Sequence, residues 1–318
     1  MRKIIAIVMA VLMLAAMTAC QPAVDDGKYV IGISQFMPHD ALDQATQGFK
    51  DAVIAGLGEE NVVFEQEDCA GDPANCASAA NALVSAKVDL IMANATPAVQ
   101  AVANATKTIP VLGTSVTEYG VALGVENFSG LTGSNVSGTS DLADLEKQAK
   151  MILQWCPDVK NVGLLYCLAE ANSEYQVKEV QKYLELDGVT CKMFGFTDTN
   201  DMSSVVQDAA NWSDAIYVPT DNTVADNAAV VDSVCRPAKI PVFAGEEGIC
   251  KKCGVATLSI SYYELGYTTG EMAVKILKDG AKPGEMQIQY APNVTFKYNA
   301  DICEALGISP VEGYEPIG

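Results

Sequence analysis

The chain has 318 residues, with 40 acidic and 20 basic side chains and a net charge of −20 at pH 7. This balance argues against nucleic acid as a partner, because phosphate binding depends on neutralisation by Lys and Arg. A chain of this length suffices for two domains of the usual ~100–200 residues each.

The first nineteen residues have the pattern of a secretory signal peptide. Two basic residues precede an apolar run from Ile4 to Met17, and small residues lead up to Cys20. The run is shorter than the about 20 apolar residues of a membrane-spanning helix. A cysteine at this point resembles the lipobox of bacterial lipoproteins, which implies a lipidated Cys20, a polar tether over 20–28 and an extracytoplasmic protein anchored to the cell membrane. An ordinary signal peptide with an incidental cysteine is the alternative.

Nine cysteines follow Cys20, and this odd number leaves at least one thiol free unless two chains pair. Disulfides are permitted outside the cytoplasm. Cys69 and Cys76 share one loop and are the pair we expect to be bonded, although a reducing habitat would leave every cysteine as a thiol. Cys250 and Cys253 have CxxC spacing, but no second CxxC supplies the further ligands of a zinc site. We therefore expect no metal and assign this pair no function; a local disulfide or surface thiols fit it better.

An internal repeat is the most informative feature of the sequence. "VDLIMANATPAVQAVANATKTIPVLGTS" (88–115) and "SDAIYVPTDNTVADNAAVVDSVCRPAKIPVFAGE" (213–246) share an order of features. Each has an acidic residue, an apolar strand, a polar break, a helical run, then Ile-Pro-Val and a second strand. The chain is therefore predicted to contain two similar units.

Each unit alternates apolar strands with helices. The first copy predicts strands near 29–34, 61–66, 89–93 and 110–114, and helices near 39–57, 74–86 and 97–107. The second predicts strands near 161–166, 189–196, 214–218 and 241–244, and helices near 172–187, 201–210 and 223–236. Short apolar strands between helices indicate a parallel sheet covered on both faces. The predicted fold class is α/β, with two similar doubly wound lobes and a ligand cleft between them.

The strand Ala215–Val218 stops at a carboxylate, Asp221, flanked by a hydroxyl and an amide. Ligands of open parallel sheets bind beyond the carboxyl ends of the strands. The equivalent break in the first copy lies at 94–97, so loops from both lobes are expected to line one cleft. Capping of the next helix is the alternative role for Asp221, and the two roles are compatible.

Several stretches resemble one known family: "IGISQFMPHDALDQATQGFKDAV", "VDLIMANATPAVQAVANATKTIPVL", "LLYCLAEANSEYQV", "DAIYVPTDNTV" and "ISYYELGYTTGEMAVKIL". They are similar to substrate-binding lipoproteins of ABC importers, in the type I periplasmic-binding branch that binds tryptophan and other aromatic amino acids. The resemblance implies two hinged lobes that close on a ligand, and a permease and an ATPase as partners. It also implies lobe 1 from 29–125 plus 261–285 and lobe 2 from 139–257 plus 294–318, with the chain crossing near 115–140, 257–262 and 284–294.

A free amino acid presents an ammonium and a carboxylate, and both must be paired in a dry site. Asp221 is the expected partner of the ammonium, with Glu246 and Glu247 as second choices. Thr96, at a helix start, and the hydroxyls of Ser115 and Thr117 are expected to meet the carboxylate. For each of these residues, local capping or turn formation is the alternative.

Two further loops are expected to contribute ligand contacts. In lobe 1, Gln35 and Phe36 follow the first strand, and Phe36 is placed to stack on an aromatic ring; His39 is either a cap or a ligand contact. In lobe 2, the expected contacts are Glu170, Asn172, Ser173 and Asn222, with Asn172 or Ser173 also capping the next helix.

The sequence contains no Ser-His-acid arrangement, no metal triad and no GxGxxG after the first strand. We therefore expect no catalysis and no cofactor. A ligand-sensing lipoprotein for a membrane receptor is the alternative to an importer subunit, and another small amphipathic metabolite is the alternative ligand.

Overall fold

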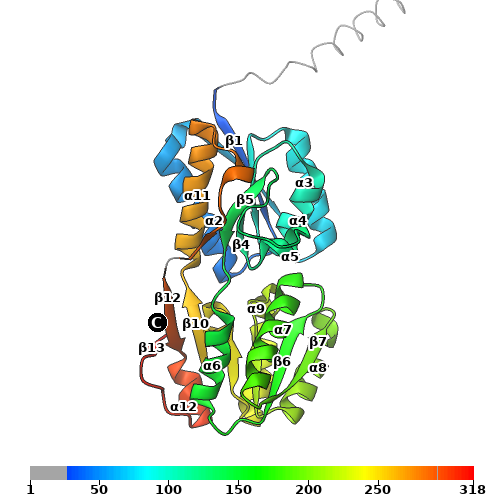
Figure 1. Ribbon diagram of the computed structural model, residues 1–318, viewed down its shortest axis with the longest axis vertical. Helices are drawn as coiled ribbons and strands as arrows, with labels where there is room; N and C mark the ends of the chain where they lie inside the picture. Colours follow the sequence, from blue (N-terminus) through cyan, green and yellow to red (C-terminus); the bar gives the residue numbers. More distant parts are fainter. Residues whose placement is uncertain (1–26, 292) are drawn as a thin grey trace, which may run out of the picture.

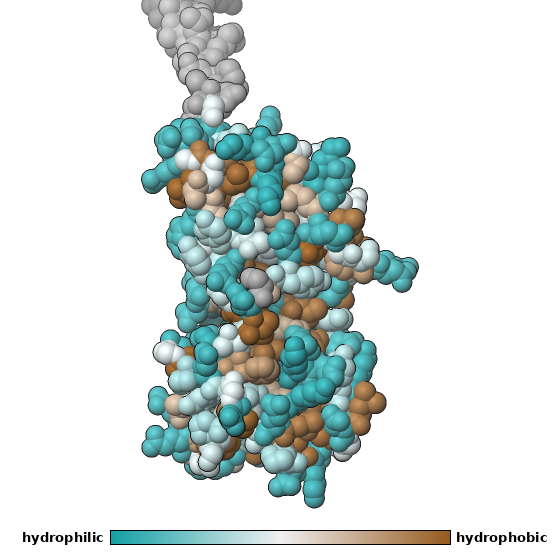
Figure 2. Space-filling view, turned by 60° about the vertical axis from the view of Figure 1, so that its left-hand side comes forward, coloured by the Kyte–Doolittle hydropathy of each residue, from teal (hydrophilic) through white to brown (hydrophobic). Residues whose placement is uncertain are grey.

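The computed structural model describes residues 27–291 and 293–318, so the predicted signal peptide and Cys20 lie outside the described residues. The chain forms two lobes, one above the other, each with a sheet between layers of helices (Figure 1). In the space-filling view the outer surface is mainly hydrophilic, and apolar residues gather at the waist between the lobes (Figure 2). No helix within the described ranges is long and apolar enough to span a membrane.

The first lobe has a six-stranded sheet in the order β11-β5-β4-β3-β1-β2, and its paired strands are all parallel. The strands are β1 (Tyr29–Gln35), β2 (Val62–Asp68), β3 (Leu90–Asn94), β4 (Val111–Val116), β5 (Val136–Ser140) and β11 (Gln289–Tyr290). The helices are α2 (Asp40–Leu57), α3 (Pro73–Ala86), α4 (Thr96–Ala105), α5 (Tyr119–Leu123) and α11 (Tyr262–Asp279), with short 3-10 helices η2 (Glu59–Asn61) and η3 (Pro283–Glu285).

The second lobe has a seven-stranded sheet in the order β13-β12-β10-β9-β8-β6-β7, in which β10 and β12 are antiparallel. The strands are β6 (Asn161–Cys167), β7 (Thr190–Phe196), β8 (Ala215–Val218), β9 (Val242–Ala244), β10 (Ala256–Ile260), β12 (Val294–Tyr298) and β13 (Glu315–Pro316). The helices are α6 (Leu145–Trp155), α7 (Ala171–Leu186), α8 (Thr199–Trp212), α9 (Asn222–Ala238), α10 (Glu247–Cys253) and α12 (Ala300–Leu306).

Each sheet is apolar on both faces, as the predicted fold class requires. In β3, Leu90 and Met92 belong to the core beneath α2 and α11, whereas Ile91 and Ala93 belong to the core beneath α3 and α4. Successive side chains of a strand point to opposite faces, so a continuous apolar run covers both. The prediction of two doubly wound α/β lobes is confirmed.

The internal repeat is visible in the hydrogen bonds. Asp89 accepts a bond from the backbone N–H of Val30 at 2.8 Å, and Asp214 accepts the equivalent bond from Asn161 at 2.8 Å. In both lobes the acidic residue before the third strand therefore anchors the start of the first strand. This explains why an acidic residue opens both copies of the repeat.

Three connections join the lobes. The chain leaves the first sheet after Ser140, returns between β10 and α11 at Ser261, and crosses once more between β11 and β12. The first crossing was expected near 115–140, but residues 136–140 form β5 of the first sheet. The first connection is therefore short, and Asp141 begins it.

Helices α2 and α11 pack with their backbones in close contact. A Cβ on Gly266 would lie 1.9 Å from the carbonyl oxygen of Ala45, and a Cβ on Gly48 would lie 2.1 Å from that of Tyr263. These glycines thus permit the approach that fixes the start of α11, and with it Tyr262, against the start of α2.

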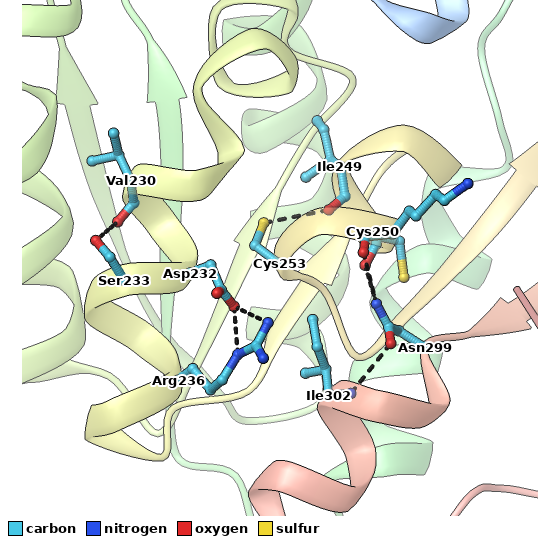
Figure 3. A network of polar contacts seen from close by, with 10 residues as sticks. Val230, Asp232, Ser233, Arg236, Ile249, Cys250, Cys253, Asn299 and Ile302 are labelled. Carbon is cyan, nitrogen blue, oxygen red and sulfur yellow. Dashed lines mark hydrogen bonds and ion pairs between the residues drawn. The ribbon is translucent and has the colours of Figure 1, made fainter.

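Of the two arrangements expected for Cys250 and Cys253, a local disulfide or surface thiols, the surface location is wrong because both side chains are buried. Cys253 Sγ points to the carbonyl oxygen of Ile249, while Asn299 Nδ2 donates to the carbonyl oxygen of Cys250 at 3.2 Å (Figure 3). Asn299 also caps α12. Asn299 therefore links α10, which contains the CxxC segment, to the start of α12, and both cysteines are free thiols.

Candidate functional site

A small cavity of about 10 Å³ lies between the lobes at the carboxyl ends of their strands. Its walls come from the starts of α2, α7, α9 and α11 and from the loops after β4, β5, β8 and β9. The lining residues are His39, Ala41, Leu42, Ser115, Thr117, Asp141, Asn172, Thr220, Asp221, Asn222, Ala225, Glu246 and Tyr262.

Six of the eleven predicted ligand-binding residues line this cavity: Ser115, Thr117, Asn172, Asp221, Asn222 and Glu246. The other five, Gln35, Phe36, Thr96, Glu170 and Ser173, are buried around it without lining it. Phe36 packs in the first lobe's core with Met37 and Leu42 and does not line the cavity. Gln35 bonds to Asp43 and Thr46, and this arrangement joins β1 to α2.

Asp221 is both a helix cap and part of the cavity wall. Its Oδ1 accepts the backbone N–H of Val224 at 2.9 Å, and its Oδ2 accepts that of Cys167 at 2.7 Å. The carboxylate thus joins the start of α9 to the end of β6. Burial and the nearby charge of Glu170 raise the pKa of Asp221 above its ordinary value.

Glu170 organises the same corner from outside the cavity. Its oxygens accept bonds from the backbone N–H groups of Asn222 and Thr223, at 3.1 and 2.8 Å. They also accept from the side chains of Asn222 at 2.6 Å and Thr223 at 2.8 Å. A carboxylate at a helix start is favoured by the helix dipole, so the role of Glu170 is to fix the α9 start.

Glu246 is one of three buried carboxylates that line the cavity, together with Asp141 and Asp221. It caps α10 by accepting the backbone N–H groups of Gly248 and Ile249. Burial raises the pKa of Glu246 to about 7, against the opposing effect of these hydrogen bonds.

Two hydrogen bonds connect the lobes across the cavity. His39 Nε2 lies 3.1 Å from Asn222 Oδ1, and Gln176 Nε2 lies 3.5 Å from Thr117 Oγ1. Because Asn222 Nδ2 donates to Glu170, its Oδ1 is the acceptor and His39 Nε2 carries the proton. Burial lowers the pKa of His39, which favours the neutral ring. The lobes are thus in contact on the cleft side.

Polar atoms without partners concentrate around the cleft. Among the described side chains, five buried oxygens in this region lack a hydrogen bond: Asn94 Oδ1, Thr96 Oγ1, Ser115 Oγ, Asp141 Oδ1 and Asn172 Oδ1. Buried polar groups in folded proteins are nearly always paired, and each exception needs an explanation. Three of these oxygens, on Ser115, Asp141 and Asn172, belong to residues that line the cavity, where a polar ligand would supply the missing partners.

Backbone strain occurs at the same place. Ala95 has φ 84° and Ser115 has φ 54°, in the left-handed region that non-glycine residues rarely adopt. Both lie at the carboxyl ends of neighbouring strands, β3 and β4. Strain of this kind costs about 1–3 kcal/mol and concentrates at functional sites.

A larger cavity of about 400 Å³ adjoins the first on the side of the connections between the lobes. The two share Ala41, Glu246 and Tyr262 as a common wall. Its remaining lining is mostly charged or polar, and an ion pair at 2.7 Å between Lys297 and Glu247 crosses it. No group of three or more His, Cys, Asp or Glu suited to a metal ion occurs in the described parts of the chain.

Sequence reasoning missed Asp141, Tyr262 and the apolar wall of Ala41, Leu42 and Ala225. Asp141 follows a strand of small polar residues that resembles a loop in sequence. A signal was available for Tyr262, because it is the last residue of the second predicted crossing, 257–262. His39 was left open between cap and contact; it lines the cavity and makes no side-chain cap bond to α2.

Two parallel α/β lobes with unpaired polar atoms around a cleft between them define a two-lobed solute-binding protein. The family model for ABC transporter substrate-binding proteins matches residues 30–313, so the chain belongs to this family. A relative named tyrosine-binding protein, from Clostridioides difficile strain R20291, is 33% identical over 278 residues, which span 87% of this chain and 80% of the relative.

Solved structures agree with this assignment. A Streptococcus pneumonia protein in complex with L-Trp is 32% identical, with a TM-score of 0.86 over 91% of this chain and 100% of that one. The ligand-free, open structure of a Clostridium difficile substrate-binding protein with adhesive properties is 35% identical, with a TM-score of 0.70 over 91% of this chain and 99% of that one. Because the identities are similar, the difference in TM-score indicates a lobe arrangement closer to that of the ligand complex.

Proposed function

We propose that this protein captures an aromatic amino acid, such as tyrosine, tryptophan or phenylalanine, for an ABC importer. The observation that carries the proposal is the set of five buried, unpartnered oxygens around the cleft. The printed names of two relatives, a tyrosine-binding protein and an L-Trp complex, support the ligand class.

The cavity offers groups suited to both ends of an amino acid. The carboxylates of Asp141, Asp221 and Glu246 suit an ammonium, which must be paired when it leaves water. The hydroxyls of Ser115 and Thr117 suit a carboxylate, as does Thr96 at the start of α4, where the helix dipole favours negative charge.

Ligand entry requires movement of the lobes. A cavity of about 10 Å³ has room for about one water molecule, which is far less than an aromatic amino acid needs. We infer that the lobes separate to admit the ligand and close on it, as a population shift driven by contacts that exist only when both lobes touch it.

We also propose that the protein works outside the cytoplasm, held to the membrane by a lipid on Cys20, beside a permease and an ATPase. The basis is the signal-like N-terminus and the family assignment. A Cys20→Ala form is expected to stay unprocessed or to leave the membrane fraction; a processed form that remains membrane-bound would contradict the lipid anchor.

The test of function is a thermal-shift screen of the purified protein against the twenty amino acids. An aromatic amino acid is expected to raise the midpoint of unfolding, because a ligand that binds only the folded state stabilises it. Absence of any shift at millimolar concentrations of all twenty would contradict the amino-acid assignment.

A further inference from the structure

The three carboxylates of the cavity differ in their free hydrogen-bonding capacity. Asp221 and Glu246 each use both oxygens on backbone N–H groups of the protein. Asp141 differs from both, because its Oδ2 accepts the Tyr262 hydroxyl at 3.0 Å while its buried Oδ1 has no hydrogen-bond partner. Of these three carboxylates, only Asp141 therefore has a buried oxygen that accepts no hydrogen bond.

No Lys or Arg lines the described walls of this cavity to neutralise Asp141. Burial raises the pKa of Asp141, and the hydrogen bond from the Tyr262 hydroxyl acts against this shift. A positively charged donor on a ligand would both donate a hydrogen bond to Asp141 Oδ1 and favour the ionised form of Asp141. Charge-assisted hydrogen bonds of this kind are about twice as strong as neutral ones.

Asp141 also lies next to the groups that suit a carboxylate. Val116 of β4 is paired with Ser140 of β5, and the backbone N–H of Asp141 donates to the carbonyl oxygen of Val116 at 3.2 Å. Ser115 and Thr117 flank this pairing point, and the Ser115 hydroxyl is unpartnered. An ammonium and a carboxylate attached to the same carbon atom of the ligand match this arrangement, whereas a ligand with widely separated charges does not.

We propose, on the basis of the proposed function, that Asp141, oriented by Tyr262, binds the ligand's α-ammonium, and that Asp221 instead positions the loops around it. The substrate class is then narrowed to free α-amino acids, and ligands without a free amine are rejected. Because Asp141 starts the first connection and Tyr262 follows the second, amine binding joins two of the three segments that link the lobes.

Titration calorimetry with L-tyrosine and L-tryptophan, and with their deaminated propanoate analogues, tests this assignment. The unmodified protein is expected to bind an amino acid at least 100-fold more tightly than its analogue. Asp141→Asn should weaken amino-acid binding at least 30-fold and change analogue binding less than about threefold. Asp144→Asn, which removes the same charge three residues on from an exposed α6 cap, should change neither.

Asp221→Asn gives a second measurement that does not depend on the folding of Asp141→Asn. It is expected to keep the preference for the amine even where overall affinity falls. Loss of that preference in Asp221→Asn, its retention in Asp141→Asn, or equal losses for amino acid and analogue in Asp141→Asn would overturn the assignment alone. Failure of the unmodified protein to bind tyrosine, tryptophan or phenylalanine would overturn the proposed function and the assignment with it.

Discussion

At the scale of single residues, the cleft depends on carboxylates that are buried close together. Asp221 and Glu246 each hold the start of a helix, and Asp141 holds the Tyr262 hydroxyl. Burial raises the pKa of all three. In the absence of ligand they oppose folding when ionised, and they favour it when protonated.

The raised pKa of Glu246 predicts how the free energy of unfolding depends on pH. This pKa is about 7 in the folded protein and about 4.5 unfolded, so the folded state binds the proton more tightly. The resulting stability is fully present below about pH 4.5 and is lost as the pH rises through 7. At about 1.4 kcal/mol per pKa unit, the loss is about 3 kcal/mol.

Urea unfolding of the ligand-free protein at pH 4.5 and pH 8 is the corresponding measurement. Glu246→Gln is expected to reduce the fall in the free energy of unfolding between these pH values by about 2–3 kcal/mol. Glu312→Gln, at an exposed position, is the control and should follow the unmodified protein. An identical fall in Glu246→Gln would contradict the raised pKa.

The sequence was informative about the site wherever a strand ended abruptly at polar residues. Asp221 and Glu246 were found in this way, and both line the cavity. Asp141 was not, because its significance arises from the pairing of β4 with β5 and from the Tyr262 hydroxyl, which lies 121 positions away in sequence. Phe36 shows the converse: its place after β1 suggested a contact, but it turns into the core.

At the scale of secondary-structure elements, apolar strands followed by helices were predictable to within a few residues. Strand β5 was not, because its sequence is Val-Ser-Gly-Thr-Ser although all five residues are buried. Its hydroxyls are paired internally: Thr139 with Thr269 at 2.8 Å, and Ser140 with the carbonyl oxygen of Thr117 at 2.7 Å. In β5, hydrogen bonds between buried polar groups thus take the place of apolar side chains, so the pattern of hydrophobic residues does not predict this strand.

The contact of α2 with α11 allows a direct test at this scale. Gly266→Ala would place a Cβ 1.9 Å from the carbonyl oxygen of Ala45, so the helices must separate. We expect a loss of about 1–3 kcal/mol in the free energy of unfolding, as in other overpacked cores. Glu271→Ala, at an exposed position of the same helix, should change it by less than about 0.5 kcal/mol. Equal stability of both variants would contradict the tight packing.

The predicted disulfide pair does not share a loop, because Cys69 lies in the connection between β2 and α3 whereas Cys76 lies in the first turn of α3. Cys69 and Cys76 are free thiols in the structure, both buried and close enough to interact, since the pKa of Cys69 is lowered chiefly by Cys76. The pairing stays a prediction for the protein in an oxidising compartment. Mass spectrometry of protein digested without reductant should show a peptide linked through these two cysteines; alkylation of both in denaturant alone would contradict it.

At the scale of the whole molecule, two lobes meet across a cleft that hydrogen bonds of the described residues bridge. The His39–Asn222 bond is one of them, and it links the start of α2 to the start of α9. His39→Ala should favour the open arrangement and weaken amino-acid binding by about 1 kcal/mol, or roughly fivefold. Small-angle scattering should show a larger radius of gyration for ligand-free His39→Ala than for the unmodified protein. Equal radii and equal affinities would show that this bond does not hold the lobes together.

The most direct test is a crystal structure of the protein grown with the amino acid that gives the largest thermal shift. We expect one ligand molecule between the lobes, with its ammonium and carboxylate in contact with Asp141 and Ser115. Its α-carbon should lie within the cavity that Asp221 also lines. A ligand bound instead in the larger cavity beside Glu247 and Lys297, with the space between the lobes empty, would contradict it.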